Sequence, residues 1–302
     1  MKRDASELYT IESISELMRH NGLPKPSHPL VTLVDYNKHK IDLRDAGNRF
    51  SLDFYKISFK TSFHGQVKYG QGYYDFEDGG LAFLAPGQVV TMSGDELGYQ
   101  GYALYFHPDL IRNYGLGKSI HQYGFFSYAV SEALCLSEKE KQVITSLFNA
   151  IALELDTNID SFSQDVLVSH LELLLNYSNR YYNRQFLTRK PVYTDLIGKM
   201  ELYLKDWFND SKMAATGLPT VQQMADHLNV SPRYLTDLLK SLTGQSAQQH
   251  IHNHLIEQAK ILLSTQTLTV AEVAYTLGFE HPQSFNKLFK KHVGVSPGAF
   301  SR

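Results

Sequence analysis

The sequence predicts an α+β fold, in which a β-barrel with accompanying helices is followed by an all-α domain. Three observations lead to this prediction. Short runs of alternating apolar residues, typical of strands, fill residues 29–110. Apolar residues recur at helical spacing over residues 137–182, and one helix–turn–helix pattern occurs twice between residues 218 and 302. With 302 residues, the chain is long enough for two domains with cores of their own.

The composition excludes some classes of protein. A net charge of −2 gives no overall basic excess, so affinity for nucleic acid would come from a local patch and depend steeply on salt. Such a patch is expected after residue 280, where lysine and arginine occur without any acidic residue. The single cysteine, Cys135, excludes an internal disulfide and suits a reducing compartment. We recognise no signal peptide and no membrane-spanning apolar run, and therefore expect a cytoplasmic protein with no membrane partner.

Residues 1–28 are expected to form an amphipathic helix or arm. Four apolar side chains share one face of a helix over residues 5–20: Ile11, Ile14, Leu17 and Met18. We expect this face to pack against the following domain. The alternative is an arm that binds a partner.

Residues 29–110 are expected to form a small sandwich or barrel of short strands. The apolar alternation that reaches Phe54 continues from Ile57 in the opposite phase, as a β-bulge at Tyr55 and Lys56 would produce. The aromatic side chains of this region have two interpretations, the lining of an effector pocket or the core and rim of the barrel. They include Phe54, Tyr69, Tyr73, Tyr99 and Tyr102.

Residues 111–186 are expected to form helices that pack on the barrel, mainly over 137–156 and 165–182. Their apolar stripes are broader than one buried face requires, which indicates a subunit interface and a homodimer. The alternative is that both helices only cover the sheet. Residues 187–194 are polar and basic and are expected to link this part to the domain at 195–302.

The C-terminal domain contains two copies of one helix–turn–helix pattern, at residues 220–244 and 269–294. Each copy begins with a threonine capping box and leaves its first helix through a left-handed residue, Asn229 or Gly278. Proline starts each second helix, and glycine ends it. The alternative, a generic helical domain with a solvated polar face, does not explain two copies joined by one long helix.

The second helix of each copy has an apolar face and a polar face. The apolar faces consist of Leu235, Leu238 and Leu239 in the first copy and Phe285, Leu288 and Phe289 in the second. The polar faces consist of Arg233, Thr236, Asp237 and Lys240 in the first copy and Gln283, Asn286, Lys287 and Lys290 in the second. Arginine and amides suit base edges and lysine suits phosphates, so both helices are predicted to read DNA.

Residues 195–302 resemble the C-terminal signature of the AraC/XylS family of bacterial transcription regulators. The matching residues are Ala259, Leu262, Leu263, Ala274, Gly278, Phe279, Phe285, Phe289, Lys290, Gly294, Ser296 and Pro297. Leu255 departs from the signature, because the family usually carries arginine there. Residues 80–87 resemble the second cupin motif, and the family commonly carries a cupin-like sensor at this position.

The resemblance implies that the two recognition helices enter successive major grooves of double-stranded DNA, about 34 Å apart. Base contacts are then expected from Arg233, Thr236 and Asp237 in the first helix and from Pro282, Gln283, Asn286 and Lys287 in the second. Phosphate contacts are expected from Lys240, Lys290 and Lys291. Arginine suits guanine, and the amides of Gln283 and Asn286 suit adenine.

A metal-binding cupin requires a cluster of histidines, with one of them after the Pro86-Gly87 pair, where this chain has none. His64 and His107 are isolated and are interpreted as strand-end histidines. His250 and His254 share one helical face but lack a third ligand, so a solvated face is the better interpretation. We therefore expect no metal, no cofactor and no catalytic residues.

Taken together, these residues predict a ligand-responsive transcription regulator and not an enzyme. An effector in the barrel would change the spacing of the DNA-binding domains in a dimer. Two alternatives are a cupin-type enzyme with a helical passenger domain and a dimeric regulator without an effector. Contact with RNA polymerase is left open by the resemblance.

Overall fold

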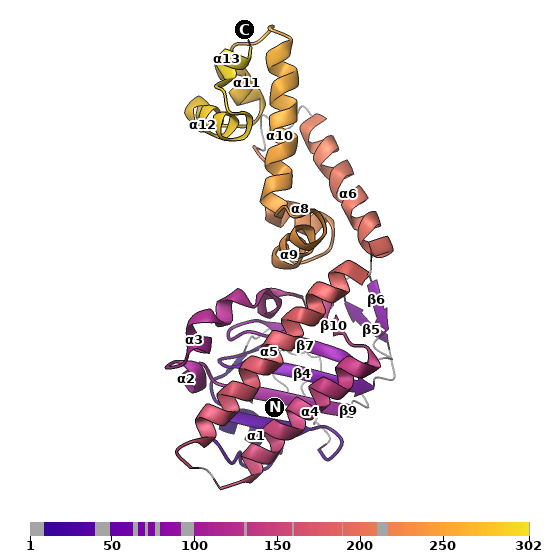
Figure 1. The fold of residues 1–302 in the computed structure, drawn as a ribbon, viewed down its shortest axis with the longest axis vertical. Coiled ribbons are helices and arrows are strands. Elements are labelled where there is room, and N and C mark those ends of the chain that lie inside the picture. Colours follow the sequence, from indigo (N-terminus) through magenta and orange to yellow (C-terminus); the bar gives the residue numbers. More distant parts are fainter. Residues whose placement is uncertain are drawn as a thin grey trace. The chain divides into compact units, whose positions relative to one another are not determined.

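The structure of the protein is a computed structural model. It describes residues 9–39, 49–62, 66–69, 72–75, 79–91, 100–129, 132–158, 160–188, 190–209 and 217–301. Two compact units make up the chain, Met1–Gln185 and Phe186–Arg302 (Figure 1). The first contains sheets and helices and the second contains only helices in its described part, so the predicted α+β fold is confirmed. Over the described ranges, every helix is too short or too polar to cross a bilayer.

The described strands of the first unit form two sheets and a separate hairpin. The strands are β1 (Tyr9–Ile11), β2 (Val31–Asp35), β3 (Arg49–Leu52), β4 (Tyr55–Ser62), β5 (Gln66–Tyr69), β6 (Gly72–Asp75), β7 (Gly80–Leu84), β8 (Val90–Thr91), β9 (Gln100–Phe106) and β10 (Leu134–Cys135). Five strands follow the order β10-β7-β4-β9-β2, three follow the order β1-β3-β8, and β5 pairs with β6. The pairing of β1 with β3 is parallel, and the other described pairs are antiparallel.

The change of phase between Phe54 and Ile57 is not a β-bulge, and that prediction was wrong. β3 and β4 belong to different sheets, and Asp53 and Phe54 connect them. The phase changes because the chain passes from one sheet to the other. The irregularity of β4 lies farther on, between Lys60 and Ser62, where its register with β9 shifts.

Two long helices, α4 (Glu138–Asp156) and α5 (Ser163–Thr188), lie across one face of the five-stranded sheet (Figure 1). The ring centroid of Phe148 on α4 lies 5.4 Å from the ring centroid of Phe59 and 5.6 Å from that of Tyr102. Tyr182 on α5 packs against Phe83, with 6.2 Å between the two ring centroids. The helices therefore cover the sheet, as predicted.

The N-terminal segment packs against the small sheet and against residues of β2 and β9. It forms β1 and then α1 (Ile14–His20), whereas a single helix was expected. Ser13 caps α1 by accepting a hydrogen bond from the Glu16 N–H. The four apolar side chains of the predicted face are all buried, in one cluster with residues that include Leu52, Phe54 and Tyr105.

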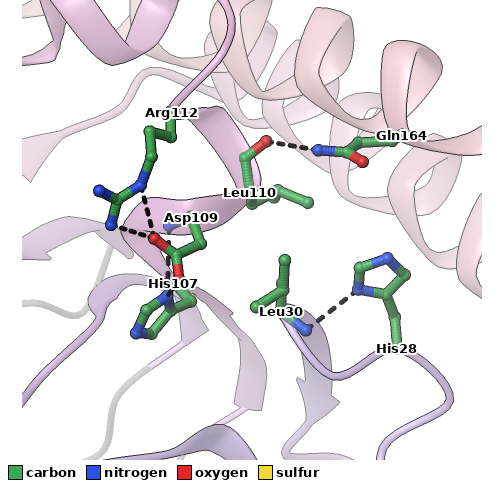
Figure 2. Close-up of polar contacts among 7 residues, drawn as sticks. All are labelled: His28, Leu30, His107, Asp109, Leu110, Arg112 and Gln164. Carbon is green, nitrogen blue, oxygen red and sulfur yellow. Dashed lines mark hydrogen bonds and ion pairs between the residues drawn. The ribbon is translucent and has the colours of Figure 1, made fainter.

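His107 follows directly on β9 and caps the short helix α2 (Pro108–Ile111) (Figure 2). Its Nδ1 accepts a hydrogen bond from the Asp109 N–H at 3.2 Å. This position confirms His107 as a strand-end histidine. The Gln164 side chain donates to the Leu110 carbonyl at 2.8 Å and so ties α2 to α5 (Figure 2). The short helices that follow α2 are α3 (Gly115–Ser119), η1 (Ile120–Gln122) and η2 (Gly124–Ser127).

The helices of the second unit are α6 (Lys190–Asn209), α8 (Val221–His227), α9 (Pro232–Thr243), α10 (Ala247–Ser264), α11 (Val270–Thr276), α12 (Pro282–Val293) and α13 (Pro297–Phe300). Residues 187–194, expected as a linker, lie at the end of α5 and the beginning of α6. The division between the two units falls between Gln185 and Phe186.

Candidate nucleic-acid interface

The first helix–turn–helix consists of α8 and α9, and local side-chain caps define both helices. The Thr220 Oγ1 accepts a hydrogen bond from the Gln223 N–H at 3.1 Å, and Gln223 Oε1 accepts one from the Thr220 N–H at 2.8 Å. At the start of α9, the Ser231 hydroxyl accepts a hydrogen bond from the Tyr234 N–H at 3.3 Å. Thr269 and Glu272 form the matching capping box on α11. Both predicted boxes are confirmed.

α8 and α11 end in the same turn. In each, the N–H of the second residue beyond the helix cap donates to a carbonyl five residues earlier, as in a Schellman motif. These hydrogen bonds join Val230 to Ala225 and Phe279 to Ala274, both at 3.0 Å. The residues between helix and donor, Asn229 and Gly278, have φ of 56° and 77°, so the predicted left-handed residues are confirmed.

The second turn requires glycine for an additional reason. A Cβ on Gly278 would lie 2.9 Å from the Gly217 Cα, a distance that real Cβ contacts essentially never show. The close approach of these two backbones therefore excludes a side chain where the first turn accepts Asn229. Gly244 and Gly294 end α9 and α12 with φ of 76° and 87°, as predicted.

α10 lies between the two helix–turn–helix units and packs against both (Figure 1). Its buried side chains share one core with α6, α8, α9, α11 and α12. Leu255 is fully buried in this core. The position at which the family usually carries arginine therefore packs in this chain and makes no charged contact.

The apolar faces of α9 and α12 point into the same core. Leu235, Leu238 and Leu239, and Phe285 and Phe289, are fully buried. Leu288 is only half-buried and packs at the edge of the core. The predicted inward faces are confirmed, and they orient the polar faces toward solvent.

The polar face of α9 contains an ion pair that the sequence analysis did not predict. The Arg233 Nε donates to Asp237 Oδ2 at 2.8 Å, four positions along the helix. The Thr236 hydroxyl donates to the Pro232 carbonyl at 2.9 Å, and Lys240 is exposed. The Asp237 carboxylate therefore holds the Arg233 side chain in place on this face.

The start of α9 is also anchored by Tyr234, a residue that sequence reasoning missed. Tyr234 is 7 % exposed, and its hydroxyl lies 3.2 Å from that of Tyr193 on α6. The ring of Phe186 packs edge-on against Tyr234 with centroids 5.3 Å apart. The sequence did contain a signal for this role, because Tyr234 is an aromatic residue between Arg233 on the polar face and Leu235 on the apolar face.

The polar face of α12 is open. Gln283, Asn286, Lys287, Lys290 and Lys291 are exposed. Within the described ranges, none of these five side chains forms a hydrogen bond or an ion pair with another residue. Pro282, at the first helical position, is half-buried. The structure thus places all the predicted contact residues on α9 and α12. The arginine on α9 is held by an ion pair with Asp237, whereas the amides and lysines on α12 have no such partner among the described residues.

Histidines gather on α10 and are partly withdrawn from solvent. Burial lowers the pKa of His250, and the neighbouring His254 lowers it further. Burial also lowers the pKa of His252, whose ring lies 5.6 Å from the ring of His292 on α12. Among the residues that the structure describes, no group of three or more His, Cys, Asp or Glu side chains is placed to hold a metal ion, and His64 lies outside them.

Sequence comparisons match both units to known families. Residues 43–174 match the AraC-like ligand binding domain, and residues 224–302 match a helix-turn-helix domain. The arabinose operon regulatory protein of Escherichia coli is 33 % identical over 98 residues, which are 32 % of this chain and 32 % of that protein. The transcriptional regulator YfiF of Bacillus subtilis is 26 % identical over 160 residues, which are 51 % of this chain and 48 % of that protein. The chain therefore spans at most about half the length of these curated relatives.

Solved structures overlap with the chain at low TM-scores. The C-terminal domain of AraT, a response regulator from Geobacillus stearothermophilus, is 30 % identical and covers 35 % of this chain and 84 % of its own, with a TM-score of 0.31. ToxT from Vibrio cholerae is 15 % identical, and the overlap covers 90 % of this chain and 98 % of the ToxT chain, with a TM-score of 0.29.

The two domain matches define a protein with a ligand-binding domain of the AraC type followed by a helix-turn-helix domain. This organisation agrees with the resemblance of residues 195–302 to the AraC/XylS family of transcription regulators.

Proposed function

We propose that this protein is a sequence-specific DNA-binding transcription regulator, controlled by a small-molecule effector and active as a homodimer in the cytoplasm. The observation that carries the proposal is the pair of helix–turn–helix units packed on α10, each with an apolar face in the core and a polar face in solvent. The similarity to the arabinose operon regulatory protein of Escherichia coli supports it.

The two recognition helices have different roles in this proposal. Arg233, held by Asp237, reads guanine from α9, because its terminal nitrogens remain available beyond the Nε that binds the carboxylate. Gln283 and Asn286 read adenine from α12. Thr236, Pro282 and Lys287 lie beside these readers in the groove.

Phosphate contacts complete the proposed interface. Lys240 on α9 and Lys290 and Lys291 on α12 are exposed on the same helices as the base-reading residues. Lysine binds phosphate as a point charge, and each contact releases counterions from the DNA. We therefore expect the affinity to fall steeply as salt rises.

The effector belongs to the first unit in this proposal, and the match of residues 43–174 to the AraC-like ligand binding domain supports that assignment. The dimer contact is assigned to α4 and α5. Several large apolar side chains of this region are exposed: Leu153 (68 %), Phe162 (68 %), Val166 (37 %) and Leu173 (44 %). A second copy that covered these side chains would remove them from water.

The proposal is tested by DNA binding of the purified full-length protein to fragments from upstream of its own gene, across a salt series. Wild type is compared with Arg233→Ala and Gln283→Ala, and Gln222→Ala on α8 is the matched control because it is exposed but off the recognition helices. Each reader variant is expected to lose about 1–3 kcal/mol of sequence discrimination, while the control retains it. Absence of selective binding by the folded wild type at low salt would overturn the proposal.

A further inference from the structure

The second unit contains an open groove of about 360 Å³ between α6 and α8. Among the described residues, its lining consists of Leu202, Tyr203, Asp206, Trp207 and His227. The first four lie on α6 at spacings that share one side of a helix, and His227 is the last residue of α8. The groove is therefore separate from the proposed DNA-reading residues, which lie on α9 and α12. A groove of this volume suits a small molecule.

Three aromatic rings line this groove. The ring centroid of Tyr203 lies 4.7 Å from that of His227 and 5.6 Å from that of Trp207. The Trp207 Nε1 donates a hydrogen bond to the Gly217 carbonyl at 3.2 Å, so its polar group is satisfied and its ring remains for a ligand. Tyr203 and Trp207 are half-buried and pack against the core of the second unit. Aromatic rings attract cations, and the indole ring does so most strongly.

The groove also carries negative charge. The Asp206 carboxylate is exposed and forms no hydrogen bond or ion pair within the part of the chain that the structure describes. Asp226, next to His227, accepts a hydrogen bond from the Gln222 amide at 2.8 Å but has no cationic partner among the described residues. Burial raises the pKa of the Tyr203 phenol, and the nearby Asp226 carboxylate raises it further. The rings therefore lie in a negative field.

The combination of rings and carboxylates selects the charge of the occupant. Asp206 and Asp226 would repel a phosphate or a carboxylate. A neutral apolar molecule would cover the Asp206 carboxylate without supplying a partner, which costs free energy. An organic cation suits both features, because its charge can lie beside the carboxylate while its alkyl groups pack on the rings. The exposed side chain of Leu202 adds apolar surface to the same groove.

We propose that the groove between α6 and α8 binds a small organic cation of the alkylammonium class. The positively charged head lies beside the Asp206 carboxylate and the Tyr203 ring, and the alkyl groups pack against Trp207 and Leu202. Because the lining comes from both helices, the bound cation links α6 to the first helix–turn–helix unit and stabilises the second unit. The site is separate from the effector site proposed for the first unit.

The test uses the purified full-length protein with choline as the probe, compared with a neutral isostere in which a tert-butyl group replaces the trimethylammonium group. Trp207 is the single tryptophan of the chain, so its fluorescence reports directly on the groove. Sodium chloride keeps the ionic strength constant during the titration. Choline is expected to produce a saturable change in Trp207 fluorescence and to raise the melting temperature, while the isostere does neither.

Variants of the lining connect this response to the groove. Asp206→Asn should weaken choline binding about two- to fivefold, as expected for the loss of one exposed ion pair. Tyr203→Leu should weaken it about 2- to 30-fold, whereas Tyr203→Phe keeps an aromatic ring and should retain most of the affinity. The controls Glu280→Gln and Tyr275→Leu remove an exposed carboxylate and an exposed tyrosine from the second helix–turn–helix unit. Both controls should bind choline like wild type.

An equal response of wild type to choline and to the isostere would overturn the inference, and so would the absence of a saturable response to choline. Unchanged choline affinity in Asp206→Asn or in folded Tyr203→Leu would overturn it as well. If the melting curve shows that Tyr203→Leu does not fold, the comparison of Asp206→Asn with Glu280→Gln decides. All these measurements are made without DNA, so their outcome is independent of the proposed regulator function.

Discussion

Arg233 and Asp237 form an ion pair on the polar face of α9, with 2.8 Å between the Arg233 Nε and Asp237 Oδ2. The pair lies at the (i, i+4) spacing at which helix side chains meet. It fixes an arginine at the surface, where its side chain would otherwise sample many rotamers. On α12 the corresponding face has amides and lysines without such a brace.

We predict that Asp237→Asn lowers the sequence selectivity of DNA binding but strengthens nonspecific binding. Without the carboxylate, Arg233 loses its preferred orientation and the repulsion between Asp237 and phosphate is removed. The measurement is the ratio of affinities for the upstream fragment and for a scrambled duplex, at several salt concentrations. A variant with unchanged selectivity would show that the ion pair has no part in base reading.

The contact between Gly278 and Gly217 predicts a strong effect of a small substitution. Gly278→Ala should destabilise the second unit by about 1–3 kcal/mol, because a Cβ there meets the Gly217 backbone and φ is left-handed. The measurement is urea unfolding followed by fluorescence of Trp207, the single tryptophan, whose Nε1 donates to the Gly217 carbonyl.

Asn229→Gly is the matched control for Gly278→Ala, because it changes the equivalent residue of the first turn. Glycine adopts the left-handed φ of Asn229 without strain, so we expect a change of only a few tenths of a kcal/mol. Equal destabilisation by both variants would contradict the special role of the Gly278–Gly217 contact.

The lowered pKa values of His250 and His252 predict that the second unit loses stability in mild acid. Below the ordinary histidine pKa of 6.5, the unfolded chain takes up protons that these folded side chains resist. The unfolding free energy should therefore fall as pH decreases through 6.5. The positive neighbours His292 and Lys291 lower the pKa of His252 further, as His254 does for His250. The Glu201 carboxylate raises the pKa of His250 and so partly offsets the effect there.

His252→Gln should reduce this pH dependence, as measured by urea unfolding above and below pH 6.5 with Trp207 as the probe. His281→Gln is the control, because His281 is exposed and its side chain makes no capping hydrogen bond. If both variants keep the pH dependence of wild type, that dependence does not come from His252 and its neighbours His292 and Lys291.

The exposed apolar side chains of α4 and α5 predict that Leu173→Glu disrupts a homodimer. A charge placed in an apolar contact is left without solvent or a partner, so association should weaken by at least about tenfold. The measurement is molar mass by size-exclusion chromatography with light scattering, over a dilution series. Val89→Glu, which changes an exposed apolar residue elsewhere in the first unit, should leave the mass unchanged.

A wild type that is monomeric at high concentration would contradict the assignment of this surface. A Leu173→Glu variant that stays dimeric would instead place the contact elsewhere in the chain.

Local rules explain why so much of the second unit could be predicted. Capping boxes, left-handed turn residues and inward faces depend on contacts within three to five positions along one helix. The sequence by itself therefore predicts the capping box of Thr220 and Gln223, the left-handed turn at Asn229 and the buried face around Leu235. The first unit was less predictable, because strands pair with distant segments.

Only the tertiary structure decided how distant segments meet. It assigned β3 and β4 to different sheets, which replaced the expected bulge near Tyr55, and it placed Gly278 against Gly217. It also placed His227 of α8 beside Tyr203 of α6. No periodicity along the chain specifies these contacts, because each one depends on which backbone lies opposite, and that depends on the packing of the whole unit.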